Sequence, residues 1–238
     1  MNTVLALDTS TTACSVALLG DGRIVAARFE EMDRGQAERL NPMLGEVMAE
    51  AGLAFADLSL VAVTTGPGAF TGLRIGLACA RAIELAAGVP LAGITTFAAL
   101  AQAVPERERS GAEADRDIVV CVNAKRRDVF VQHFDAALRP RGAAGALEPD
   151  AAAAALAQGR FLIAGDGAAQ LRAALEATGE AGEDAAARLR FSSALGPPDA
   201  RHVAVLGALA GPSALPPRPF YIRPPDVRLP SPRPVPRP

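Results

Sequence analysis

Two glycines flank a proline at Gly66-Pro67-Gly68, a spacing that suits phosphate binding. The triplet follows an uncharged, β-branched run over residues 60–65 and precedes a proline-free, alanine-rich stretch over 72–87. This composition predicts a buried strand, a sharp turn and a helix. Backbone N–H groups at the positive end of a helix often hold phosphate. A tight turn without a ligand explains the same residues, and both interpretations stay open.

The histidines and cysteines of the chain do not have the spacing of a metal site. His133 and His202 are far apart in the sequence, and neither has a second ligand at a suitable spacing. Cys14, Cys79 and Cys121 are also well separated, in apolar contexts. This odd count predicts reduced core thiols in a cytoplasmic protein rather than a disulfide framework. We therefore expect no tightly bound metal.

Composition argues against several classes of protein. Half of the 238 residues are hydrophobic, which is enough for one large core or two small ones. A formal net charge of −2 argues against general polyanion binding, and the few aromatic residues argue against a base-stacking surface. Asp8 interrupts the N-terminal apolar run, so we expect no signal peptide. Arg81 and Glu84 interrupt the best candidate for a membrane span, so we expect no membrane contact.

Hydrophobic periodicity predicts the elements that position the glycine turn. A three-stranded meander precedes an amphipathic helix, and a strand, the turn, a second helix and another strand follow. Thr71 is the predicted N-cap of that second helix. The predicted strands cover residues 4–8, 13–19, 23–31, 60–65 and 89–94, and the predicted helices cover 36–51, 72–87 and a short segment that opens at Thr95.

The remainder of the chain has the pattern of a second, smaller unit. A charged segment over residues 104–117 predicts a solvated hinge, and residues 179–187 predict an exposed loop. The proline- and arginine-rich residues 224–238 predict an extended, disordered tail that is idle or touches RNA or a partner. The predicted strands cover 118–123, 129–134 and 161–164, and the predicted helices cover 147–157, 168–177 and 197–210.

The string GPGAFTGLRIG, which begins at Gly66, resembles the GPGSFTGxRIG signature of the bacterial TsaB (YeaZ) family. That family is related to TsaD, the enzyme that makes threonylcarbamoyladenosine in tRNA. The resemblance extends from Thr3 to Leu100, and more loosely to Arg223, where Pro219-Phe-Tyr-Ile-Arg resembles the closing motif of the family.

The resemblance implies an α/β, actin-like or Hsp70-like fold of two lobes, each a mixed sheet flanked by helices. The predicted order of elements over residues 3–94 agrees with such a first lobe. We expect the first lobe over residues 1–103, rejoined by residues 197–223. Residues 104–196 are then expected to form a second, degenerate lobe.

The predicted strand over residues 4–8 ends in an aspartate that is followed by hydroxyl residues, and this end of the strand resembles the first phosphate-binding loop of the actin-like superfamily. In that superfamily a glycine turn of the second lobe approaches the adenosine of the nucleotide, and Gly165-Asp166-Gly167 is similar to this turn. These resemblances imply weak nucleotide binding, with ATP or ADP near a subunit interface and no tightly bound cofactor. Asp8 is equally well explained as a carboxylate that caps a turn. The candidate nucleotide-binding residues are Asp8, Thr9, Ser10, Thr11, Gly66, Gly68, Gly165 and Gly167.

Several residues depart from the pattern of the family. TsaD relatives carry two histidine metal ligands where Thr96 and Leu100 stand here. Gln36 and Ala37 replace a histidine and a serine, and Asn123 replaces an aspartate. Leucine cannot ligate a metal, and an amide is a poor substitute for a metal-binding carboxylate. These differences favour a scaffold over an enzyme.

The function that the resemblance implies is a non-catalytic subunit of the threonylcarbamoyladenosine machinery. The expected partners are TsaD and the small ATPase TsaE, with tRNA reached indirectly and a homodimer in isolation. The alternative is a stand-alone phosphotransferase, ATPase or peptidase of the same fold. A scaffold outside tRNA modification also stays open.

Two helices and one hairpin are the candidate contact surfaces. TsaB relatives use the two first-lobe helices both to self-associate and to bind TsaD. Lys125, Arg126 and Arg127 form a basic hairpin tip that serves solubility or contacts tRNA phosphate or an acidic partner. That most of the leucines belong to an ordinary core is the alternative, and periodicity alone does not decide between the two. The candidate interface residues are Leu40, Met43, Leu44, Val47, Leu73, Arg74, Leu77 and Arg81.

Overall fold

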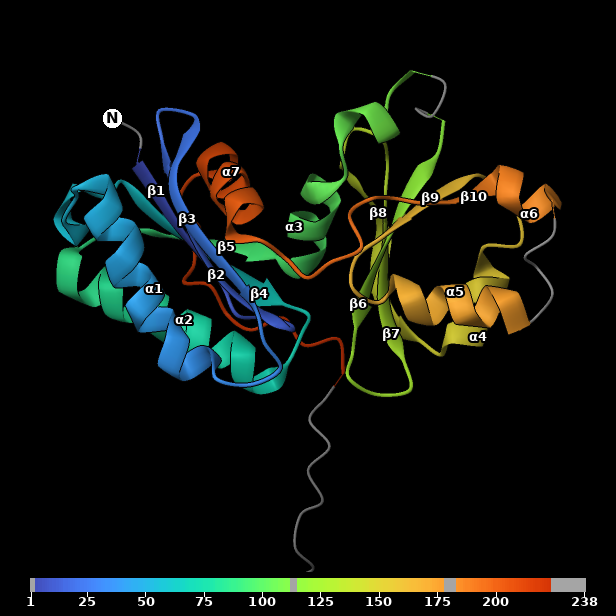
Figure 1. Ribbon diagram of the computed structural model, residues 1–238, viewed down its shortest axis with the longest axis horizontal. Coiled ribbons are helices and arrows are strands. Elements are labelled where there is room, and N and C mark those ends of the chain that lie inside the picture. The colour runs from blue at the N-terminus through green and yellow to red at the C-terminus, as the bar shows by residue number, and fades with distance from the viewer. Residues whose placement is uncertain (1–2, 112–114, 178–182, 224–238) are drawn as a thin grey trace, which may run out of the picture.

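The computed structural model describes residues 3–111, 115–177 and 183–223, which fold around two five-stranded mixed sheets (Figure 1). The predicted tail over 224–238 lies outside the described residues. No helix in the described part of the chain is long and apolar enough to cross a bilayer.

The first sheet has the strand order β3-β2-β1-β4-β5. Strand β1 lies at its centre, antiparallel to β2 and parallel to β4. The outer pairs are antiparallel β2 with β3 and parallel β4 with β5. The strands are β1 (Thr3–Asp8), β2 (Ala13–Gly20), β3 (Arg23–Glu31), β4 (Leu60–Gly66) and β5 (Leu91–Thr95).

The second sheet repeats this topology in the order β10-β9-β6-β7-β8. Its central strand β6 is antiparallel to β7 and parallel to β9, as β1 is to β2 and β4. The outer pairs also correspond in direction. The prediction of a two-lobe, actin-like α/β fold is therefore confirmed. The strands are β6 (Asp117–Asn123), β7 (Val129–Phe134), β8 (Pro140–Leu147), β9 (Phe161–Ala164) and β10 (Leu189–Phe191).

Helices cover both faces of the first sheet. Alternate side chains of β1 face in opposite directions, so Leu5 and Leu7 pack toward α1 (Gln36–Ala51) and α2 (Phe70–Ala87). Val4 and Ala6 pack on the other face against α7 (Ala200–Ala210). The first sheet with α1, α2 and α7 is called the first lobe below.

The second sheet, called the second lobe with its helices, is covered by α4 (Pro149–Ala155) and α5 (Ala168–Ala177) on one face. Helix α3 (Thr96–Ala103) packs on its other face and also contacts α7, so α3 lies between the two sheets (Figure 1). The remaining short elements are α6 (Glu183–Arg188) and two 3₁₀ turns, η1 (Phe55–Asp57) and η2 (Glu106–Glu108).

Some local predictions were wrong. Helix α2 begins at Phe70 with Ala69 as its N-cap, so Thr71 lies inside the helix. The expected loop over 179–187 contains α6 in its described part. Strands β8 and β10 were not predicted, because their sequences lack the β-branched runs that signal a strand.

After α7 the chain returns along the first lobe as an extended strap. The Ser213 N–H donates to the Leu91 carbonyl oxygen at 2.8 Å, and the Phe220 N–H donates to Thr65 at 2.7 Å. The strap therefore satisfies backbone groups of β5, which is an edge strand, and of the end of β4.

Candidate functional site

Asp8 lies at the end of β1, where the first lobe faces the second. Its side chain is fully buried, and Oδ1 accepts hydrogen bonds from the hydroxyls of Ser10 and Thr64, both at 2.6 Å. The Ser10 N–H also donates to Oδ1, at 3.2 Å. Burial raises the pKa of Asp8 to about 6, although these hydrogen bonds act in the opposite direction.

Asp166 lies in the second lobe, in the turn that follows β9, and this turn corresponds to the one that follows β4 in the first lobe. Its Oδ1 accepts a hydrogen bond from the Asn123 N–H at 3.0 Å. Burial raises the pKa of Asp166 to about 6, against the effects of the Asn123 N–H and the neighbouring Thr11 hydroxyl. The charge of Asp166 in turn contributes to the raised pKa of Asp8. The carboxyl groups of the two lobes therefore lie within electrostatic reach of each other.

The glycines beside Asp166 allow its turn to approach β6. Gly165 has φ +94°, and a Cβ atom there would lie 2.3 Å from the Cys121 carbonyl oxygen. A Cβ atom at Gly167 would lie 2.9 Å from the carbonyl carbon of Val122. These two predicted nucleotide-binding residues thus have a packing role that needs no ligand.

The glycine turn after β4 is filled by the chain itself. The Ala69 N–H donates to the Ser10 carbonyl oxygen at 2.7 Å, and a Cβ atom at Gly68 would lie 2.1 Å from that oxygen. A Cβ atom at Gly66 would meet the Phe220 carbonyl oxygen at 2.6 Å. Protein backbone therefore packs directly against both glycines, so these residues have a packing role that needs no ligand.

Most hydroxyl groups of the loop after β1 already form hydrogen bonds within the protein. Thr9 Oγ1 donates to the Gly72 carbonyl oxygen at 2.7 Å, and the Ser10 hydroxyl is bound to Asp8. Thr11 is 4% exposed, and its hydroxyl has no hydrogen-bond partner among the described residues. Of the predicted nucleotide-binding hydroxyls, that of Thr11 alone forms no hydrogen bond of regular geometry, although it lies beside the Asp166 carboxyl, and nucleotide binding stays a prediction.

An open cavity of about 770 Å³ lies beside Thr11, where the first turns of α1 and α2 meet the second lobe. Neither helix has a side chain that caps its N-terminus. Lys125 reaches the cavity from the β6–β7 hairpin and forms an ion pair with Asp33 at 2.8 Å. Gln36 lines the same cavity, and its side chain donates to the Met32 carbonyl oxygen at 3.1 Å. This cavity is the place where a small ligand could enter between the lobes.

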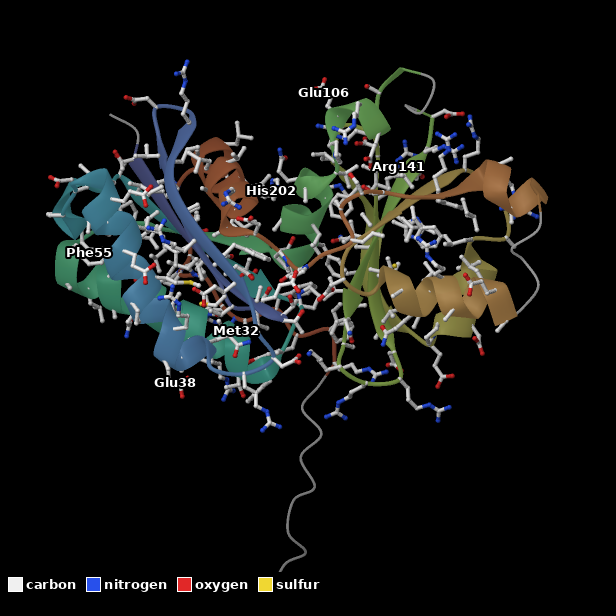
Figure 2. All side chains as sticks on the ribbon, viewed as in Figure 1. Met32, Glu38, Phe55, Glu106, Arg141 and His202 are labelled. Atoms are coloured by element: carbon white, nitrogen blue, oxygen red, sulfur yellow. The ribbon has the colours of Figure 1, made fainter. Side chains whose placement is uncertain are left out.

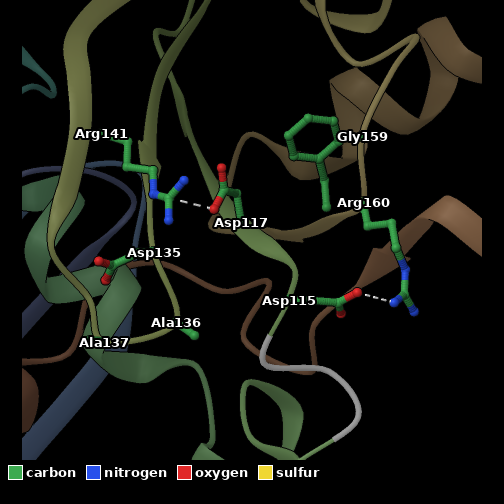
Figure 3. Close-up of a pocket in the computed structure, with 9 residues that line it drawn as sticks. Asp115, Asp117, Asp135, Ala136, Ala137, Arg141, Gly159 and Arg160 are labelled. Carbon is green, nitrogen blue, oxygen red and sulfur yellow. Dashed lines mark hydrogen bonds and ion pairs between the residues drawn. The ribbon is translucent and has the colours of Figure 1, made fainter.

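A second cavity, of about 420 Å³, lies in the second lobe (Figure 3). Its three acidic side chains are each paired with an arginine: Asp117 with Arg141 at 3.4 Å, Asp135 with Arg139 at 3.3 Å, and Asp115 with Arg160. Because these charges neutralise one another, this cavity has no excess charge that would select a ligand.

The described residues contain no group of three or more histidine, cysteine, aspartate or glutamate side chains that could hold a metal. His202 lies on α7 of the first lobe (Figure 2), and His133 lies on β7 of the second. Thr96 is fully buried, and Leu100 is 1% exposed in the apolar cluster between α3 and the second sheet. Two positions that carry metal ligands in TsaD relatives therefore belong to the core here.

The predicted interface residues do not form a surface patch, which corrects that expectation. Arg74 and Arg81 do lie at the surface, where Arg74 stacks on Phe70 and donates to the Tyr221 hydroxyl. The apolar candidates are 0–6% exposed and belong to the core, because the periodic stripe of each helix faces the sheet. They are Leu40, Met43, Leu44, Val47, Leu73 and Leu77.

The outward faces of the same helices carry small residues instead. Leu85, which is 86% exposed, stands near the end of this face. Sequence periodicity could have located these positions as the residues opposite the apolar stripe. The exposed small or polar residues are Asn41, Gly45 and Ala49 on α1 and Ala78, Ala82 and Ala86 on α2.

Comparison with known proteins places these features in a family. Residues 30–218 match the family model described as TsaD: tRNA N6-adenosine threonylcarbamoyltransferase. The tRNA threonylcarbamoyladenosine biosynthesis protein TsaB of Escherichia coli is 41% identical over 99 residues, which are 42% of each chain. The TsaB protein of Haemophilus influenzae is 36% identical over 128 residues, 54% of this chain and 52% of that one. The matched region thus spans about half the length of these curated relatives.

The structural comparison covers almost the whole chain. YeaZ from Pseudomonas aeruginosa is 30% identical, with a TM-score of 0.72 over 93% of this chain and 100% of that one. A second Pseudomonas aeruginosa structure, described as similar to peptidase YeaZ, is 28% identical, with a TM-score of 0.72 over 94% of this chain.

Proposed function

Because the chain belongs to the TsaB (YeaZ) family, we propose that it is a non-catalytic subunit of the bacterial machinery that makes threonylcarbamoyladenosine in tRNA. In this proposal TsaD transfers the threonylcarbamoyl group to N6 of the adenosine next to the anticodon. The present chain pairs with TsaD and supports that reaction, with TsaE as the other partner and tRNA reached through the complex.

The observation that carries the non-catalytic role is the apolar environment of Leu100. The resemblance to TsaD relatives implies a metal ligand at this position, whereas Leu100 packs here with Phe97, Ile118 and Val120 in the core between α3 and the second sheet. A hydrophobic contact of this kind stabilises the arrangement of the two sheets but offers no ligand atom. In this proposal the position contributes packing rather than a metal ligand.

The partner surface in this proposal is the outward face of α1 and α2. A Cβ atom at Gly45 would meet open space, and Ala78 and Ala82 lie one turn apart on the exposed side of α2. Such small side chains let a partner helix approach closely, and Leu85 adds exposed apolar area at one end. The same face serves the homodimer and the complex with TsaD, so the two assemblies compete.

In this proposal the complex with TsaD binds a nucleotide, and the isolated chain does not. The open cavity beside Thr11, at the first turns of α1 and α2, adjoins the proposed partner surface. In this proposal ATP or ADP binds there only after TsaD supplies further contacts, because backbone atoms of Ser10 and Phe220 already pack against the two glycines of the turn.

A reconstituted reaction tests the proposal. Purified TsaD, TsaE, ATP, threonylcarbamoyl-adenylate and unmodified tRNA are incubated with and without this chain, and modified nucleoside is measured by mass spectrometry. We expect no product from the chain alone and a rise of about tenfold or more when it joins TsaD. Equal product with and without the chain would contradict the proposal. Steady ATP hydrolysis by the isolated chain, abolished by Asp8→Ala, would support the alternative of a stand-alone enzyme.

A further inference from the structure

The strap after α7, residues 211–223, joins the first lobe to the second. On the first lobe, the Phe220 N–H donates to the Thr65 carbonyl oxygen at 2.7 Å. Two residues later, Ile222 packs against the apolar cluster between α3 and the second sheet. The last described residues of the strap therefore leave the first lobe and contact the second.

An ion pair closes this contact. Arg223 pairs with Asp128, which directly precedes β7 in the hairpin between β6 and β7. The side chain of Asp128 is 7% exposed, whereas that of Arg223 is 46% exposed. A carboxylate buried to this extent is costly without a positive charge beside it. Arg223 therefore stabilises Asp128 more than an ion pair between two exposed side chains would.

Tyr221 connects the same segment to α2. Its ring stacks on Phe70 with the ring centroids 5.5 Å apart, and its hydroxyl accepts a hydrogen bond from Arg74 Nε at 3.3 Å. Phe70 and Arg74 lie one helical turn apart at the start of α2. Three successive residues thus contact three parts of the molecule: Tyr221 contacts α2, Ile222 the apolar cluster beside α3, and Arg223 the β6–β7 hairpin.

The two chain crossings between the lobes meet at Glu108, away from this contact. Glu108 follows α3 on the way into the second lobe, and its carboxylate accepts from the hydroxyls of Ser192 and Ser193 on the way back, both at 2.6 Å. Figure 1 shows the segment after α3 at the top of the view and the end of the strap at the bottom, beside the β6–β7 turn. A rotation of the lobes about these crossings would therefore open the edge that the strap closes.

The open cavity beside Thr11 lies at this same edge, because Lys125 of the β6–β7 hairpin lines it together with the first turns of α1 and α2. The ion pair of Lys125 with Asp33 also crosses the cavity, but these side chains are 44% and 82% exposed. Solvent and salt screen such a pair, so it contributes little to holding the lobes together.

We propose that residues 219–223 are a latch that holds the β6–β7 hairpin of the second lobe against α2 of the first. While the latch is closed, Arg223 neutralises Asp128 and the hairpin limits the width of the cavity. When the latch is released, the lobes rotate about the crossings at Glu108 and the cavity widens. The inference does not depend on the proposed role in tRNA modification.

Tyr221 reports on the latch directly, because the chain has one tyrosine and no tryptophan. Quenching of its fluorescence by acrylamide in the full chain measures how far solvent reaches its ring. We expect Arg223→Gln and Asp128→Asn each to raise the quenching constant by about 1.5-fold or more, because the strap then opens locally. Arg218→Gln replaces an exposed arginine of the same strap and should leave the constant unchanged.

Small-angle X-ray scattering of the same proteins measures the separation of the lobes. We expect a larger radius of gyration for Arg223→Gln than for the unchanged chain and Arg218→Gln, with circular dichroism showing that all three are folded. Unchanged quenching in Arg223→Gln would overturn the proposal. Raised quenching at an unchanged radius would show that the strap covers the lobes without holding them, and would also overturn it.

Discussion

The carbonyl oxygen of Thr9 lies 2.0 Å from the position that a Cβ atom would occupy at Gly72. Gly72 belongs to the first turn of α2, and the Thr9 hydroxyl donates to its carbonyl oxygen at 2.7 Å. The second glycine of the turn, Gly68, makes room for Ser10 in the same way. The glycines of the signature thus allow the loop after β1 to pack against α2.

This relationship predicts that Gly72→Ala is strongly destabilising. Alanine normally stabilises a helix relative to glycine by up to about 1 kcal/mol, but here its methyl group would overlap the Thr9 backbone. We expect the free energy of unfolding in urea to fall by about 2–3 kcal/mol. Gly45→Ala in α1 is the matched control, because its Cβ would meet open space and should raise stability by about 0.5–1 kcal/mol. Equal effects of the two substitutions would contradict this account.

Leu100 lies in the core, so we predict that a single substitution cannot introduce a metal ligand there without loss of stability. Leu100→His would place a polar ring among apolar side chains and should lower the free energy of unfolding by about 3 kcal/mol. Leu85→His, at a position 86% exposed, should change stability by less than about 0.5 kcal/mol. Urea denaturation checks both values. A stable Leu100→His protein that binds zinc would contradict this prediction, because it would show that the other groups needed for a metal site are present.

The outward face of α2 predicts where association can be broken without unfolding. Ala82→Glu adds a bulky charge at an exposed helical position and should weaken both self-association and TsaD binding by about tenfold or more. Ala173→Glu on the exposed side of α5 should leave both intact. Light scattering measures the homodimer, and calorimetry measures TsaD binding. Normal association of a folded Ala82→Glu protein would place the interface elsewhere.

The two histidines predict one component of the pH dependence of stability. Burial lowers the pKa values of both His133 and His202, although Asp117 and Asp199 respectively act in the opposite direction, and Arg201 also lowers that of His202. The unfolded chain therefore binds more protons just below pH 6.5, so this contribution to stability is present above that pH and is lost as pH falls. Tm measured from pH 5 to 7.5 should fall less on acidification in His202→Gln than in the unchanged protein. An identical pH profile would contradict the assignment for His202.

The sequence predicted most elements of the first lobe, because their signals are local. Strands β1 to β5 have apolar runs bounded by turns, and α1 carries an apolar stripe from Leu40 to Met48. Strand β8 was missed because Pro140–Leu147 contains small residues and pairs with β7 through its backbone. Its strand character comes from its neighbour rather than from its own side chains.

The site was less predictable, because it depends on contacts between distant parts of the chain. Asp8 was a candidate from its loop, but nothing local to Gly165-Asp166-Gly167 indicates that the charge of Asp166 acts on the pKa of Asp8 from the other lobe. The direction of the α1 and α2 stripes was also undecided, since periodicity shows that one face is apolar but not whether it meets a sheet or a partner. Packing of Leu77 on the first sheet decides this question in favour of the core.

The most direct test of the central claim is the threonylcarbamoyladenosine content of tRNA in cells that lack this gene. Bulk tRNA is digested to nucleosides and analysed by mass spectrometry, with and without a plasmid that carries the chain. We predict that the nucleoside falls severalfold or disappears on deletion, returns with the unchanged chain and with Ala173→Glu, and does not return with Ala82→Glu. Undiminished threonylcarbamoyladenosine in the deletion strain would contradict the proposed function.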